Sequence, residues 1–128
     1  MAGFSDYMEG EIIKWTLRPG VTPDFPQPTN VYVALFTTMP IEAGTGGVEV
    51  SGGSYARQIG TFDSTGANSA QINFPAATAD WGTVIGAGIY DAVTSGRFMY
   101  FGTLSTSRTI RNGDTFRFDV GNLKVTLD

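Results

Sequence analysis

The sequence predicts an all-β fold, an antiparallel β-sandwich of jelly-roll type that forms one domain and is preceded by a short N-terminal helix. Short segments with alternating apolar residues recur from residue 30 onward, and clusters of Gly, Asn, Asp, Ser and Thr separate them. Only the amino end shows helical periodicity, and 128 residues suffice for one hydrophobic core. We expect a helix or arm at 1–18, a proline-rich linker at 19–29 and a β-sandwich domain at 30–128.

The helix is predicted from its cap, its apolar spacing and its stop signal. Ser5 is a suitable N-cap, and Pro19-Gly20 ends the pattern. Gly10 weakens the helix, so we expect it to need a packing partner, either its own domain or another protein. The apolar residues at near-helical spacing are Phe4, Met8, Ile12 and Trp15.

The linker is predicted from proline content. Residues 23–28 contain three prolines, which lack backbone donors and favour an extended chain. We expect this segment to tether the helix to the β-domain.

The first strand, residues 30–38, is apolar on both faces. Val33 and Leu35 share one face, whereas Ala34 and Phe36 share the other. Such a strand belongs in the middle of a sandwich or under an assembly contact. Further strands are expected at 54–62, 70–75, 84–92, 98–105, 115–121 and 123–127.

Two short segments predict hairpins. Asn112-Gly113 is a strong hairpin signal between 109–110 and 115–118, and residues 94–97 make a similar connection. In the last hairpin we expect alternate residues of the two strands to face each other and to form one wall of the core. These residues are Phe116, Phe118 and Val120 on the first strand and Leu123, Val125 and Leu127 on the second.

The composition is typical of a protein whose surface is covered by other subunits in an assembly. Charged residues make up only 16% of the chain, against about 25% in ordinary soluble domains. The net charge is −4 and the eight basic residues are scattered, so nucleic acid is not an expected partner. The chain has no cysteine, no apolar run long enough to cross a membrane and no recognisable signal peptide.

We expect no enzymatic activity, no cofactor and no bound metal. Histidine is absent, which removes the commonest general base and metal ligand. Most carboxylates stand at turn or helix-cap positions, which explains their presence. Two alternatives stay open, namely a pair of carboxylates that cleaves glycosides and a calcium site in the loops. The glycine-rich segments 44–47 and 51–54 lack the lysine and helix of a phosphate-binding loop.

Several aromatic residues stand at strand positions and have two interpretations. Such residues usually belong to a core or an interface, and a platform for stacking sugars is the alternative. They are Trp81, Tyr90, Tyr100 and Phe101.

The segment VEVSGGSYARQ, residues 48–58, raises a similar choice. Gly52-Gly53 supplies a turn, after which Tyr55 and Arg57 fall on one face of the returning strand. A structural return is the first interpretation and a protein contact the second, because Tyr and Arg are enriched at interface hot spots. The candidate interface residues are Phe4, Tyr7, Met8, Ile12, Trp15, Tyr55 and Arg57.

From Val31 to Leu127 the chain resembles a family of small virion proteins of tailed bacteriophages. The motifs that carry the resemblance are VYVALFTT, EVSGGSYAR, FPAATADWG, GIYD and the closing RNGD turn, in that order. Family members are often labelled phage tail fibre proteins, and similar proteins are capsid cement or decoration proteins. The resemblance implies a virion protein that is assembled in the host cytoplasm.

Three functions follow from this resemblance. The first is a capsid cement protein, a homo-oligomer and specifically a trimer, that binds the major capsid protein and stabilises the head shell. The second is a tail-fibre or receptor-binding module that contacts host surface glycans. The third, a glycan-cleaving enzyme, ranks last because the sequence shows no catalytic arrangement.

Overall fold

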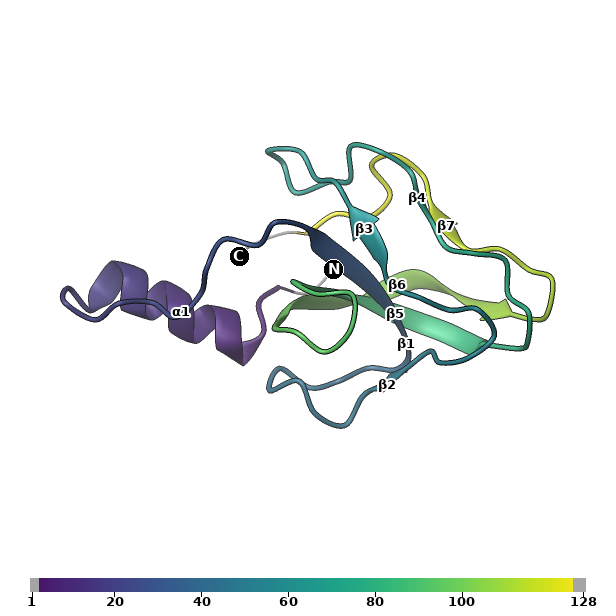
Figure 1. Cartoon of the computed structure of the whole chain (residues 1–128), viewed down its shortest axis with the longest axis horizontal. Coiled ribbons are helices and arrows are strands. Elements are labelled where there is room, and N and C mark those ends of the chain that lie inside the picture. Colours follow the sequence, from purple (N-terminus) through teal and green to yellow (C-terminus); the bar gives the residue numbers. More distant parts are fainter. Residues whose placement is uncertain (1–2, 126–128) are drawn as a thin grey trace.

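The computed structural model describes residues 3–125, which form one helix and seven strands (Figure 1). The elements are α1 (Asp6–Leu17), β1 (Val31–Thr38), β2 (Val48–Glu49), β3 (Gln58–Gly60), β4 (Ile72–Asn73), β5 (Gly82–Tyr90), β6 (Phe98–Ile110) and β7 (Arg117–Phe118). The mostly β content with one short N-terminal helix confirms the predicted fold class. The helix is too short and too polar to cross a membrane.

The strands form two antiparallel sheets. In the larger sheet the order is β2-β1-β5-β6, and β3 pairs with another part of β1. The smaller sheet contains only β4 and β7. β1 therefore lies in the interior of the larger sheet, as its two apolar faces predict.

The main core lies between the two sheets. Val33, Leu35 and Val84 are fully buried in the larger sheet, and Ile72 and Phe118 meet them from the smaller one. The other face of β1 is also buried, since Ala34 and Phe36 are 0% and 3% exposed. Burial on both faces explains why this strand has no polar alternation.

The helix begins as predicted and then leaves the sheets. The Ser5 hydroxyl accepts a hydrogen bond from the Met8 amide at 3.3 Å, which is an N-cap. Met8 forms a second small core with Ile89 and Met99. The rest of the helix extends away from the β-domain (Figure 1).

The connection at 94–97 is a hairpin as predicted, but the one at Asn112-Gly113 is not. Asp114 N–H bonds Arg111 C=O at 2.9 Å, so the turn exists. However, β6 pairs with β5 and β7 pairs with β4, so this turn leads from one sheet to the other. Asn-Gly specifies only the local turn, and burial decides which strands pair.

Other strand predictions also need correction: 70–75 is reduced to Ile72–Asn73, 115–121 is reduced to Arg117–Phe118, and the strand predicted at 98–105 extends to Ile110. Of 54–62 only Gln58–Gly60 is a strand, and β2 was not predicted. Val120 is 60% exposed, so it does not belong to the predicted core wall, although Phe116, Phe118 and Leu123 do. Segment 123–127 forms only an isolated bridge between Lys124 and Ala67 within the described residues, and Leu127 lies outside them.

The contact between Asp91 and Arg97 at the 94–97 hairpin should make the stability of the fold sensitive to acid. Burial alone would raise the pKa of Asp91. The hydrogen bonds from the Arg97 N–H at 2.7 Å and from its guanidinium at 3.0 Å outweigh this effect, so the pKa of Asp91 lies below its ordinary 3.8. A carboxylate with a lowered folded pKa stabilises the fold above its unfolded pKa, and this contribution disappears as the pH falls through the folded pKa. We expect Asp91→Asn to reduce the melting temperature at pH 7 and to flatten its decrease below pH 3.8. An unchanged slope in melting scans of the variant would contradict this assignment.

Candidate interaction sites

The first helical turn packs against its own β-domain. The Ser5 N–H bonds the Met99 carbonyl at 2.8 Å, and its hydroxyl bonds the Phe98 carbonyl. The Phe4 ring lies 5.4 Å from the Tyr100 ring, centroid to centroid. Phe4 and Met8, both predicted interface residues, thus pack within the chain and hold the helix to β6.

The proline-rich linker contains no helix or strand, and it folds back along the helix. Tyr7 donates a hydrogen bond from its hydroxyl to the Asp24 carbonyl at 3.0 Å, and the Asp24 N–H bonds the Glu11 carboxylate at 2.6 Å. Phe25 meets the Tyr7 ring edge-on at 6.0 Å. A hydrogen bond from Lys14, at 2.8 Å, lowers the pKa of Glu11. The helix and the linker therefore form one projecting unit, which we call the arm, residues 6–28.

The distal half of the arm exposes apolar side chains. Trp15 is 78% exposed and Leu17 is 73% exposed, whereas Ile12 and Ile13 are partly covered. Ile12 and Trp15 also line a mainly apolar groove of about 370 Å³, whose other wall includes Pro23 and Phe25 of the linker. The predicted interface residues of the amino end therefore divide into an internal set, Phe4, Tyr7 and Met8, and a surface set, Ile12 and Trp15.

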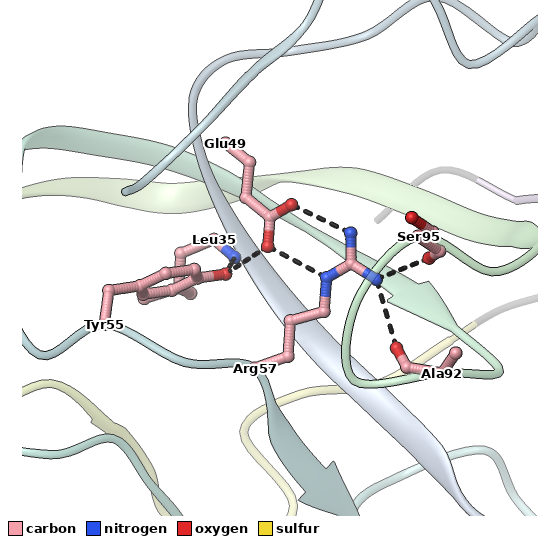
Figure 2. Close-up of polar contacts among 6 residues, drawn as sticks. All are labelled: Leu35, Glu49, Tyr55, Arg57, Ala92 and Ser95. Carbon is pink, nitrogen blue, oxygen red and sulfur yellow. Dashed lines mark hydrogen bonds and ion pairs between the residues drawn. The ribbon is translucent and has the colours of Figure 1, made fainter. Parts of the chain in front are cut away.

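Tyr55 and Arg57 join a polar cluster centred on Glu49 (Figure 2). The guanidinium forms two bonds to the Glu49 carboxylate, from Nε and Nη2, each at 2.9 Å. The Tyr55 hydroxyl donates to Glu49 at 2.7 Å and accepts the Leu35 N–H at 2.9 Å. Burial, with the bond to Glu49, raises the pKa of Tyr55 well above its ordinary value.

The same guanidinium also reaches the β5–β6 hairpin. Its Nη1 donates to the carbonyls of Ala92 and Ser95 at 3.1 and 2.7 Å (Figure 2). The group lies 3.7 Å from the centre of the Tyr90 ring, and the Arg57 side chain is only 8% exposed. Arg57 thus connects β2 to the β5–β6 hairpin, whose Ala92 and Ser95 lie 35 and 38 residues further along the chain, and its donors have partners inside the chain.

The glycines before Tyr55 form the predicted turn. Gly52 and Gly53 have φ values of +73° and +57°, and the Tyr55 N–H bonds the Gly52 carbonyl at 3.0 Å. A side chain at Gly53 would come within 2.9 Å of the Trp81 indole nitrogen, which donates to the Gly53 carbonyl. The structure shows the predicted turn, but the chain enters β3 only at Gln58, so Tyr55 and Arg57 lie before the strand and not on one of its faces. A protein contact through Tyr55 and Arg57 stays a prediction.

The predicted aromatic candidates differ in how deeply they are buried. Trp81 is buried in the main core, and Tyr90, Tyr100 and Phe101 are half-buried. Three exposed carboxylates, Asp6, Glu9 and Glu42, lie close together, and repulsion from Glu9 raises the pKa of Glu42. Within residues 3–125, every buried side-chain polar atom has a hydrogen-bond partner.

Comparison with known proteins identifies the family. A search of curated proteins finds no match to the chain. A family model described as "Podophage GP4 fiber I protein gp80" matches residues 3–126, a range that includes both the arm and the β-domain. Since the match covers nearly the whole sequence, the chain belongs to the family of the podophage GP4 fiber I protein gp80, a family of phage virion structural proteins labelled as fibre proteins.

Proposed function

We propose that the protein is a non-enzymatic subunit of a phage fibre assembly and acts through protein–protein contacts. The observation that carries the proposal is the family match over residues 3–126, because that family is described by its fibre protein. The internal use of Tyr55 and Arg57 supports a structural role for the conspicuous GGSYAR segment.

The arm supplies the contact to a neighbouring virion protein. Its first turn is fixed to β6, so its distal half is presented at a defined position. Trp15 and Leu17 are large and exposed, and Trp15 lines an apolar groove, a combination typical of interface anchors. The exposed apolar surface on a chain with few charges favours burial in an assembly.

A second candidate is the capsid cement protein. Residues 3–125 form one β-domain with an arm and contain no repeating shaft, which suits a protein that joins neighbours on a shell. In that case the partner of the arm is the major capsid protein, and the protein acts as a homotrimer.

Locating the protein on the particle tests both candidates. Purified virions, tail-less heads and isolated tails are labelled with an antibody against the protein and imaged by cryo-electron microscopy. Signal on fibres and tails but not on heads supports the fibre proposal. Signal at regular positions on tail-less heads would overturn it in favour of the cement candidate.

Replacing the exposed arm residues should strongly weaken particle binding without unfolding the protein. We expect Trp15→Ser combined with Leu17→Ser to reduce incorporation into virions by about tenfold or more, since buried anchors of this kind dominate interface energies. Incorporation is measured by complementing a deletion phage and blotting purified particles. Deleting the helix would be less informative, because it would uncover Ile89 and Met99.

The matched control is Ile59→Ser combined with Val93→Ser. These side chains are 53% and 48% exposed and belong to the β-domain, outside residues 6–28. Equal losses of incorporation with both double variants would show that the arm has no special role.

A further inference from the structure

A second groove lies where β6 faces β7, on the β-domain and apart from the arm. It has a volume of about 540 Å³, within the range of ligand sites, and both polar and apolar side chains line it. Hydroxyl side chains of β6 form one wall, namely Thr103, Ser105 and Thr106. Basic residues and the amide of Asn122 complete it, and Phe116 and Phe118 form its floor.

A wide bulge in β6 shapes this wall. Val84 pairs with Arg108 and Gly86 pairs with Thr103, so residues 104–107 lie opposite Ile85 alone. The extra residues interrupt the ladder at the outer strand of the sheet, and Leu104, Ser105 and Thr106 among them line the groove. Bulges of this kind are frequent beside functional sites, where they redirect side chains.

The groove concentrates positive charge on an acidic protein. Arg108, Arg117 and Lys124 all line it, three of eight basic residues in a chain of net charge −4. Arg117 is paired with Asp119 at 3.0 Å, whereas Arg108 and Lys124 form no ion pair within the described part of the chain. The Arg108 guanidinium lies 5.8 Å from the centre of the Phe116 ring, which holds it over the groove floor.

We propose that this groove binds an anionic saccharide, one that carries carboxylate groups. Free guanidinium and ammonium groups would bind its carboxylates, and the hydroxyls and the Asn122 amide would bind its hydroxyls. The floor rings are 3% and 6% exposed, so they offer no stacking surface for nucleic-acid bases. The proposal rests on the fibre function for the source of the ligand, a host surface, but the binding itself is tested separately.

The test is a titration of the ¹⁵N-labelled full chain with tri-galacturonic acid, followed by NMR. We expect shifts confined to residues around the groove, a weaker response as salt increases, and little response to neutral maltotriose. Equal binding of maltotriose, or no binding at millimolar ligand, would overturn the proposal. Binding of a glutamate hexapeptide but not of the saccharide would replace it with a peptide site.

Three charge variants locate the binding. Arg108→Gln and Lys124→Gln should each weaken it by about tenfold, because each removes one charged hydrogen-bond donor. Arg111→Gln removes the same charge from the turn just beyond β6, outside the groove, and should leave the affinity unchanged. Equal losses in all three variants would indicate a nonspecific charge effect and overturn the site. Failure here would leave the fibre location intact, because particle labelling decides that question independently.

Discussion

Arg57→Met should destabilise the β-domain by about 3 kcal/mol, the lower end of the range for removing one partner of a buried ion pair, because the Glu49 side chain is 26% exposed. Methionine retains much of the apolar length of the side chain but none of its donors. The variant leaves the Glu49 carboxylate with the Tyr55 hydroxyl alone and leaves the Ala92 and Ser95 carbonyls without the guanidinium. Urea unfolding at pH 7 measures the difference.

The control for this change is Arg117→Met. Arg117 also pairs with an acid, but its side chain is 61% exposed and that of Asp119 is 51% exposed. Water screens such a pair, so the unfolding midpoint should change little. The double variant Glu49→Gln and Arg57→Met should lose less free energy of unfolding than the two single variants together, because the two side chains act as a unit. Additive losses would show that the cluster is not coupled.

Features that depend on near neighbours could be predicted from the sequence. The Ser5 cap, the end of the helix before Pro19-Gly20 and the turn at Gly52-Gly53 are all local, and each is confirmed. The burial of β1 was also predictable, because apolar residues on both faces require cover on both sides.

Features that depend on distant partners were not predictable in the same way. The pairing of Glu49 with Arg57 requires β2, a two-residue strand with too short a pattern to detect. Val120 alternates with Phe118 but faces solvent, because β7 ends at Phe118 and the alternation has no sheet to follow. In both cases the tertiary arrangement decides, and local propensity does not report it.

The candidate site shows the same division. Helical spacing grouped Phe4, Met8, Ile12 and Trp15 on one stripe, but only the first two contact the β-domain, since the helix extends beyond the sheet edge. Spacing gives the face of a helix and not the length over which that face is covered. The groove beside β6 was also missed, because its basic residues come from separate segments that the fold brings together.

Asn68 has no distinguishing pattern around it in the sequence, yet its replacement should have the largest effect on stability. Its side chain is fully buried and joins residues 67–70 to the segment after β7. The amide nitrogen donates to the carbonyls of Ala70 and Asp119, and the amide oxygen accepts the Leu123 N–H, each at 2.9 Å. We expect Asn68→Ala to lower the free energy of unfolding by about 3 to 5 kcal/mol, because three backbone groups lose their partners.

The matched control is Asn73→Ala on β4, where the side chain is exposed and should contribute little. Asn68→Asp separates the causes further, because it keeps an oxygen toward the Leu123 N–H but turns the other toward two carbonyls. Since a protonated carboxyl can donate one hydrogen bond and a carboxylate none, Asn68→Asp should be more stable relative to wild type at pH 4 than at pH 7. Unfolding curves for the three variants at both pH values measure this. Because Asn68→Asp leaves no cavity, wild-type stability of this variant at both pH values would mean that the cavity, and not the lost hydrogen bonds, explains the deficit of Asn68→Ala. The expected pattern would show that the Asn68 side chain adds essential hydrogen bonds to those that the Asn68 backbone makes with Gly121 and Leu123, and that both sets hold residues 119–123 in place.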